Sequence, residues 1–197
     1  ATAESYARAE CVVEVSSLRV LQEKNAETPL PNASTTKILT AIIVIDDCDL
    51  SEIVEIPSQA AGTEGSSIYL KAGENYTVEE LLYGLMLRSG NDAAVTLALH
   101  HSGSIEAFAQ KMNEKATMLG ATDSYFVNPH GLPDKRHKTT ARDLALIAAY
   151  AVQNETFRTI VSTKYYAPRG WLNKNKMLAS YEGANGIKTG FTTDAGR

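Results

Sequence analysis

The sequence predicts an α/β protein, layered as α+β, in which an antiparallel sheet is flanked by helices. Three observations predict this fold class: a strand hairpin near the N-terminus, a helical block from about residue 77 to 163, and strand-like segments after it. Strands at both ends of a chain, with helices between them, suggest one sheet-based body that carries a helical subdomain. A length of 197 residues is within the usual size of a single domain.

The N-terminal part begins the sheet and leads into a buried helix. A Ser16-Ser17 turn separates two short apolar stretches, so we predict a hairpin over residues 9–24. Residues 33–47 follow, with a helical pattern that is apolar on nearly every face and with Asn32 as a suitable N-cap. Because only a helix surrounded by protein is apolar all round, we expect this one to be the core helix.

The helical subdomain opens with Thr77 and Glu80, which have the spacing of a capping box. A strand is predicted before it, over residues 51–56. Further helices are predicted at about 92–101, 104–119 with Ser104 as cap, 140–152 with Thr140 as cap, and 154–162. The predicted organisation is one domain over residues 1–197, with sheet parts at about 1–30 and 164–197, the core helix at about 33–47 and the helical subdomain at about 77–163.

Composition and charge exclude several classes of function. Nineteen Lys and Arg against 23 Asp and Glu give a net charge of −4, with no basic run that would attract nucleic acid. The longest nearly apolar run, Ile38 to Ile45, is far shorter than the roughly 20 residues of a membrane-spanning helix. No clustered metal ligands occur, so no metal or cofactor is expected, and Cys11 and Cys48 are expected as buried free thiols. Three methionines are interpreted as core residues: Met86, Met112 and Met118.

The pair Ser34 and Lys37 carries the first sign of chemistry. On a helix, residues three apart lie on one face within one turn, so the amine of Lys37 can reach the hydroxyl of Ser34. An amine can act as a base near neutral pH if apolar surroundings or a second cation remove its charge. Ser34 also lies in the first helical turn, where its own backbone N–H is available to hold a developing oxyanion. Taken alone, the spacing is also compatible with coincidence.

Two further motifs place polar side chains at turns and edges. Ser89-Gly90-Asn91 occupies a tight turn between two predicted helices, where a hydroxyl and an amide can face one cleft, although taken singly a helix cap is the favoured interpretation. Lys188-Thr189-Gly190 lies on a strand-like stretch and suits a carboxylate ligand, or else a polar edge strand. The three motifs together, in this order, would arise by chance at about the 1% level.

This set of motifs resembles that of the serine-type D-alanyl-D-alanine carboxypeptidases, the low-molecular-weight penicillin-binding proteins of the β-lactamase/transpeptidase-like superfamily. The similarity runs from about residue 9 to 197. The segments that carry it are Pro31 to Thr40, Gly65 to Ser67, Leu87 to Ala94, Phe126 to Pro133, Tyr181 to Ala184 and Ile187 to Thr192. The resemblance implies a β-lactamase/transpeptidase-like fold.

The resemblance also implies the roles of the reacting side chains. Ser34 is expected as the acylated nucleophile and Lys37 as its general base. Ser89 is expected to relay a proton toward the nitrogen of the leaving D-alanine. Asn91 is expected to bind peptide amide groups or to hold Lys37 in place.

The third motif is implied in substrate binding. Lys188 is expected to polarise Ser89 and attract the terminal carboxylate of the substrate, and Thr189 to bind that carboxylate. Gly190 lets the substrate approach the backbone. The backbone N–H groups of Ser34 and Phe191 are expected to form the oxyanion hole.

The chain departs from the family at its C-terminus, seven residues after the third motif. Members normally continue with further sheet strands and often with a membrane-anchoring tail. We therefore expect the chain to be a fragment in which these strands are absent, with any membrane anchor in a region C-terminal to it.

Two alternatives use the same fold. A β-lactamase needs rapid deacylation, and the Glu-x-x-Leu-Asn string typical of class A enzymes is absent: the only Leu-Asn, Leu172-Asn173, has Arg169 in the position of the glutamate. A non-catalytic penicillin-binding sensor need not keep both Ser34 and Lys37. The sequence therefore predicts a serine D,D-carboxypeptidase, without cofactor, that acts outside the cytoplasmic membrane. Its expected partners are peptidoglycan stem peptides ending in D-Ala-D-Ala, as substrate, and β-lactams, as covalent inhibitors.

Overall fold

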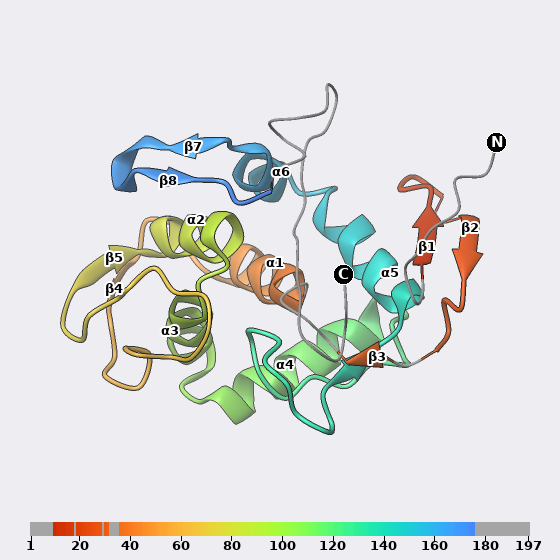
Figure 1. Ribbon diagram of the computed structural model, residues 1–197, viewed down its shortest axis with the longest axis horizontal. Helices are drawn as coiled ribbons and strands as arrows, with labels where there is room; N and C mark the ends of the chain where they lie inside the picture. The colour runs from red at the N-terminus through yellow and green to blue at the C-terminus, as the bar shows by residue number, and fades with distance from the viewer. Residues whose placement is uncertain (1–9, 18, 29, 32–35, 176–197) are drawn as a thin grey trace.

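The helix α1 (Lys37–Asp47) lies at the centre of the structure, a computed structural model that describes residues 10–17, 19–28, 30–31 and 36–175. Helices α2, α3, α4, α5 and α6 all contact it, and Figure 1 shows them arranged around it. Every residue of α1 from Lys37 to Val44 is buried. The expected core helix is thus present in its described part; residues 32–35, including the expected cap Asn32, lie outside the described residues.

The N-terminal hairpin forms as expected. Strand β1 (Glu10–Val13) pairs antiparallel with β2 (Val20–Lys24), and the register shifts between Val12 and Val13. Helix α5 packs against β1, so the hairpin is joined to the helices through α5. Figure 1 shows the hairpin at the edge of the molecule, beyond α5 from α1.

Local capping signals account for most helix starts. Thr77 accepts from the N–H of Glu80 at the start of α2 (Val78–Arg88), as a capping box requires. Ser104 and Thr140 cap α4 (Ile105–Met118) and α5 (Ala141–Ala151) in the same way. The remaining helices are α3 (Asn91–Ser102) and α6 (Glu155–Ser162), with Asn154 as the cap of α6. These bounds agree with the predicted ranges to within two residues.

The other strands are short and antiparallel. The predicted strand over 51–56 is present as β4 (Ile53–Glu55), which pairs with β5 (Asn75–Thr77). Strand β7 (Tyr165–Tyr166) pairs with β8 (Trp171–Leu172) around the 3-10 helix η2 (Ala167–Arg169). The sequence did not indicate the pair of β3 (Leu30–Pro31) and β6 (Lys138–Thr139). Strand-like segments after residue 175 lie outside the described residues, and the division into sheet parts and a helical subdomain stays a prediction.

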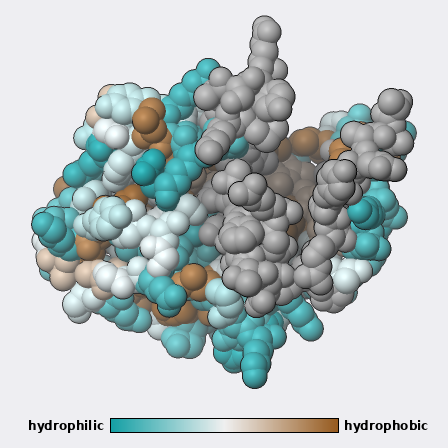
Figure 2. Space-filling view, in the orientation of Figure 1, coloured by the Kyte–Doolittle hydropathy of each residue, from teal (hydrophilic) through white to brown (hydrophobic). Residues whose placement is uncertain are grey.

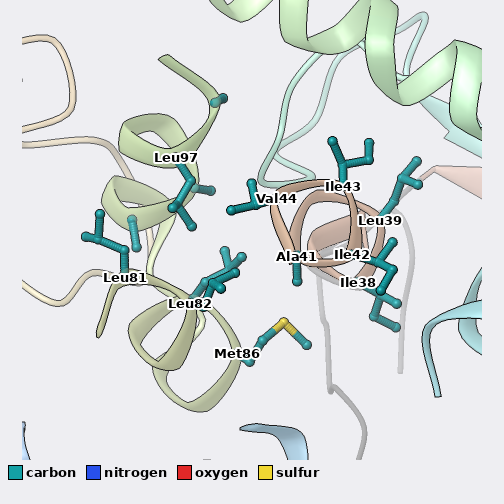
Figure 3. Close-up of a cluster of buried hydrophobic side chains, with 14 of the residues drawn as sticks. Ile38, Leu39, Ala41, Ile42, Ile43, Val44, Leu81, Leu82, Met86 and Leu97 are labelled. Atoms are coloured by element: carbon teal, nitrogen blue, oxygen red, sulfur yellow. The ribbon is translucent and has the colours of Figure 1, made fainter. Parts of the chain in front are cut away.

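The core is built on the apolar faces of α1. Figure 3 shows its isoleucine, leucine and valine side chains pointing outward in several directions, some toward Leu82 and Met86 of α2 and Leu97 of α3. These side chains are all at most 6% exposed. Burying a leucine or isoleucine contributes about 1.5–3 kcal/mol, so each of these side chains adds to the hydrophobic stabilisation. The described surface seen in Figure 2 is largely hydrophilic, with apolar residues scattered over it.

Some sequence interpretations need correction. Met86 and Met112 are buried, but Met118 is 79% exposed because it lies in the last turn of α4, where no element covers it. Cys11 and Cys48 are free thiols, partly rather than fully buried. Burial raises the pKa of both thiols. Within the described residues, no helix is both long and apolar enough to cross a membrane.

Candidate active site

The structure brings Lys37 and Ser89, which are 52 residues apart, into direct contact. Lys37 is the first residue of α1, and its side chain is 0% exposed. Its Nζ donates a hydrogen bond of 3.3 Å to the Oγ of Ser89. A lysine amine is rarely found so deeply buried, and burial favours its uncharged form. The arrangement can therefore move a proton between an amine and a hydroxyl.

Ser89 owes its position to the end of α2. Its backbone is left-handed, with φ of 61°, and the N–H of Gly90 bonds back to the carbonyl of Gly84 at 3.2 Å. Helices often end in this way, but the residue is usually glycine, and another residue costs about 1 kcal/mol or more. The chain accepts that cost at the residue whose hydroxyl contacts Lys37. Such local strain is typical of functional sites.

Asn91 begins α3, and its side chain faces the loop at 64–66. Its Nδ2 donates to the carbonyl of Glu64 at 2.7 Å, and its backbone N–H donates to the carbonyl of Ser66 at 2.7 Å. Its Oδ1 is buried and has no hydrogen-bond partner among the described residues. A buried carbonyl oxygen without a partner is costly. This oxygen is therefore available to accept an N–H from a ligand.

Asp92, next to Asn91, holds the loop over residues 67–70 in place. Its carboxylate is fully buried and accepts hydrogen bonds from Ser67 Oγ at 2.7 Å, Leu70 N at 3.0 Å and Ile68 N at 3.1 Å. Hydrogen bonds to a charged group are the stronger ones. Asp92 thus fixes the loop that in turn holds the amide of Asn91. The sequence motif includes Asp92 but gave no indication of this role.

Gly65 allows the loop to approach Asn91 closely, and we expect Gly65→Ala to reduce the activity of this site by about tenfold or more. A Cβ at this position would lie 2.6 Å from Asn91 Nδ2, so the amide would have to move. The backbone φ of +87° also disfavours alanine. Steady-state kinetics with the substrate proposed below measure the effect.

Gly62→Ala is the matched control for this prediction. Its φ is +77°, but a Cβ there would meet nothing within 4 Å. It therefore carries the same backbone cost without contacting Asn91. Equal activities of the two variants would contradict the role given to Gly65.

Two histidines, His130 and His137, belong to a loop that contacts the start of α1. Burial lowers the pKa of His137 to about 4. Burial also lowers the pKa of His130 to about 4, and Lys37 and His137 contribute to that shift when they are protonated. The Nδ1 of His130 accepts from the N–H of Leu132 at 3.1 Å, so this ring orders its turn. Both rings are uncharged at neutral pH.

These two rings make the folded state sensitive to acid. In an unfolded chain a histidine has a pKa of about 6.5, so unfolding takes up protons between pH 6.5 and 4. We expect these histidines to leave the free energy of unfolding unchanged above about pH 6.5. As the pH drops toward 4, the free energy of unfolding should fall by up to about 3 kcal/mol per histidine. Urea denaturation at a series of pH values measures this. In His137→Gln the pH dependence should be shallower, and curves parallel to those of the original protein would contradict the prediction.

Several predicted site residues lie outside the described residues. These are Ser34, Lys188, Thr189, Gly190 and Phe191. Of the predicted set, the structure therefore describes Lys37, Ser89 and Asn91, and places all three around the start of α1 and the α2–α3 turn. It also gives structural roles that the sequence analysis did not assign to four residues: Thr36, Gly65, Asp92 and His137.

The histidines at the end of α3 are engaged in ion pairs. His100 Nε2 lies 2.7 Å from a carboxylate oxygen of Glu52, and His101 Nε2 lies 2.7 Å from one of Asp47. Among the residues that the structure describes, no three His, Cys, Asp or Glu side chains gather where they could hold a metal ion. His100 and His101 therefore contact carboxylates at the end of α3.

The fold is that of the DD-peptidases, as solved structures demonstrate. A serine-to-alanine variant of a Streptomyces DD-transpeptidase has a TM-score of 0.92, with 34% identity over 99% of this chain and 84% of that one. The D-alanyl-D-alanine carboxypeptidase of Mycobacterium tuberculosis has a TM-score of 0.91, with 34% identity over 98% of this chain and 75% of that one. The predicted fold class is thus confirmed.

The chain belongs to the D-alanyl-D-alanine carboxypeptidase family of peptidases (Peptidase S11), whose model matches residues 1–197. D-alanyl-D-alanine carboxypeptidase DacF of Bacillus subtilis is 36% identical over 96% of this chain. The match covers 52% of DacF, so the chain spans about half the length of that relative. The family suggested by the sequence motifs is therefore confirmed.

Proposed function

We propose that this protein is a serine D,D-carboxypeptidase that removes the terminal D-alanine from peptidoglycan stem peptides through an acyl-enzyme. The observation that carries the proposal is the fully buried amine of Lys37, 3.3 Å from the Ser89 hydroxyl at the start of the central helix. A buried amine and a hydroxyl in contact are the parts of a proton relay. Membership in the family supports the same activity.

In this mechanism Ser34 Oγ attacks the carbonyl carbon of the penultimate D-alanine and forms a C–O bond. Lys37 accepts the hydroxyl proton of Ser34. Ser89, in contact with Lys37, passes a proton to the nitrogen of the terminal D-alanine as its C–N bond breaks. Water then attacks the ester, and the reversed proton transfers release the shortened peptide and restore Ser34. The backbone N–H groups of Ser34 and Phe191 would stabilise the oxyanion in both steps.

Substrate binding would use the second and third motifs. The unpartnered, buried Oδ1 of Asn91 supports a role in accepting an N–H from the peptide backbone of the substrate. Lys188 and Thr189 would bind the terminal carboxylate by charge and hydrogen bonding. Gly190 would let the peptide lie close to the backbone.

β-Lactams would react at the same serine. Opening of the lactam ring gives a Ser34 ester whose amine leaving group stays attached to the inhibitor, so the ester would be released slowly. The substrate lies in the cell wall, so we propose that the protein acts outside the cytoplasmic membrane. Anchoring to that membrane would require a region beyond the residues of this chain.

Labelling with a fluorescent penicillin tests the proposal on the purified protein. We expect stoichiometric labelling of the original protein and none of Ser34→Ala. Equal labelling of both proteins, or of neither, would contradict the assignment of Ser34. Release of D-alanine from a D-Ala-D-Ala peptide distinguishes the enzyme from a non-catalytic sensor, and rapid turnover of nitrocefin would instead identify a β-lactamase.

A second candidate is DD-transpeptidation, which the similarity to a structure named a DD-transpeptidase favours. The acyl-enzyme is the same, but an amine rather than water attacks the ester. Adding a D-amino acid to the peptide reaction separates the two: a product that incorporates this amine identifies transfer, whereas unchanged release of the shortened peptide identifies hydrolysis.

A further inference from the structure

The residue directly before Lys37 contacts a distant loop. Thr36 is fully buried, and its Oγ1 lies 3.2 Å from the Nε2 of His137, 101 residues later in the chain. Thr36 precedes the first residue of α1, but its hydroxyl makes no capping hydrogen bond to the helix. The described partner of this hydroxyl is therefore the histidine ring.

The other nitrogen of the ring decides the direction of this hydrogen bond. Val127 donates its backbone N–H to His137 Nδ1 at 3.1 Å, so Nδ1 must carry a lone pair. The ring is 3% exposed and uncharged at neutral pH, so its one proton is on Nε2. His137 Nε2–H therefore donates to Thr36 Oγ1.

The loop that carries His137 is itself firmly held. The ring of Phe126 packs edge-on against His137, with ring centroids 5.5 Å apart. The N–H of His137 donates to the carbonyl of Asp134 at 3.0 Å. The charged and titratable groups that face His137 electrostatically are Asp134 on the same loop and His130, which in turn faces Lys37.

A second hydrogen bond joins the same loop to α1. Thr40 Oγ1 donates to the carbonyl of Pro129 at 2.7 Å. Thr36 and Thr40 are four residues apart and thus lie on one face of the helix. The loop over residues 127–137 is therefore hydrogen-bonded to both ends of the first turn of α1. This fixes the rotation of that turn about its axis.

The rotation of that turn sets the place of the lysine amine. Lys37 follows Thr36 by one residue, about 100° around the helix axis, and extends toward Ser89. A rotation of the turn by a few degrees moves the end of a long side chain by a large fraction of 1 Å. A misplacement of about 1 Å can cost about 100-fold in rate.

We propose that His137 is a positioning residue of this site: by donating Nε2–H to Thr36 Oγ1, it fixes the first turn of α1 and so holds Lys37 against Ser89. The inference rests on the proposed function, because it assigns the rate of serine acylation to the placement of Lys37. The inference goes beyond the proposed function because it names a residue that touches neither the substrate nor a reacting atom.

Matched substitutions separate the two hydrogen bonds of the ring. His137→Asn keeps an acceptor near the position of Nδ1 but removes the donor to Thr36, whereas His137→Gln keeps a donor near the position of Nε2. Thr36→Val removes the acceptor at nearly constant volume, and Thr36→Ser keeps it. Thr96→Val is the control, because it deletes another fully buried threonine hydroxyl, which bonds within α3 to the carbonyl of Asp92.

The rate of acylation by a fluorescent penicillin is measured for each variant and divided by the fraction of protein that labels at completion. We expect a fall of about 30-fold in His137→Asn and in Thr36→Val, and a rate within about threefold of the original in His137→Gln, Thr36→Ser and Thr96→Val. The acylation rate of the double variant, which combines His137→Asn and Thr36→Val, should be no lower than that of either single variant, because both substitutions remove the same interaction. On the peptide substrate, kcat should fall while KM stays the same.

Three results would overturn the inference. The first is an acylation rate in Thr36→Val equal to that of the original protein, and the second is a pair of losses in His137→Asn and Thr36→Val that multiply in the double variant. A loss that disappears after division by the labelled fraction would also overturn it, because it would reflect folding alone. Failure of the proposed function is distinct from these, since the original protein would then not label at Ser34 at all.

Discussion

Lys37→Met should lower the rate of acylation by penicillin by about 10³-fold and leave the fold intact. Methionine fills most of the space of the lysine side chain but supplies no base to accept the proton of the nucleophile. The lysine is fully buried, so the methionine that replaces it is buried as well. Methionine also brings no charge that would have to be buried. Stopped-flow labelling with a fluorescent penicillin measures the rate, and thermal unfolding measures the stability, which should be equal or higher.

Lys115→Met is the matched control for Lys37→Met. Lys115 lies on α4, where its Nζ pairs with Asp46 at 2.9 Å and contacts Tyr150, away from the α2–α3 turn. This variant should acylate at the original rate. If Lys37→Met acylates as fast as Lys115→Met, Lys37 is not the base.

Asp92→Ala should lower the free energy of unfolding by about 3–5 kcal/mol. The carboxylate is fully buried and accepts hydrogen bonds from Ser67, Ile68 and Leu70, and each donor left without a partner costs about 1–3 kcal/mol. Asp92→Asn keeps one acceptor oxygen and should lose about half as much. Urea denaturation measures all three proteins.

Asp49→Ala provides the comparison for Asp92→Ala. The carboxylate of Asp49 also accepts hydrogen bonds, from the N–H and hydroxyl of Ser51, but at an exposed site where water can replace it. Its free energy of unfolding should match that of the original protein within error. Equal losses in the two alanine variants would show that the Asp92 contacts contribute nothing specific.

Local signals made much of the fold predictable from the sequence. Thr77, Ser104 and Thr140 each accept the N–H that a capping residue accepts, and the helices begin directly after them. The hairpin of β1 and β2 forms around the Ser16-Ser17 turn, as a short-range pattern can indicate. The buried central helix followed from the absence of a polar face between Ile38 and Val44.

Contacts between distant residues could not be predicted from pattern. Strands β3 and β6 have two residues each, too few for an alternation to be recognised, and they meet across more than 100 residues. The contact between Thr36 and His137 spans a similar separation. Met118 fits the helical period of the apolar residues in α4, but periodicity does not reveal that no other element covers this end of the helix.

The site was predicted in part, and for a different reason. The contact between Lys37 and Ser89 was not predicted, since no spacing links residues 52 apart. Resemblance to a family placed both residues in one reaction centre without saying that they touch. The motifs do not reveal what supports them, because Asp92 and Gly65 act through contacts with distant residues that a sequence pattern does not specify.

The central place of α1 ties antibiotic reactivity to the completion of folding. The helix that carries Lys37 is enclosed by elements extending to α6, so its surroundings are assembled only when the chain through residue 162 has packed. A partly folded molecule would have the proposed nucleophile but not its activating environment. Under the proposed function, covalent labelling by penicillin would then count only the fully folded molecules in a mixed population.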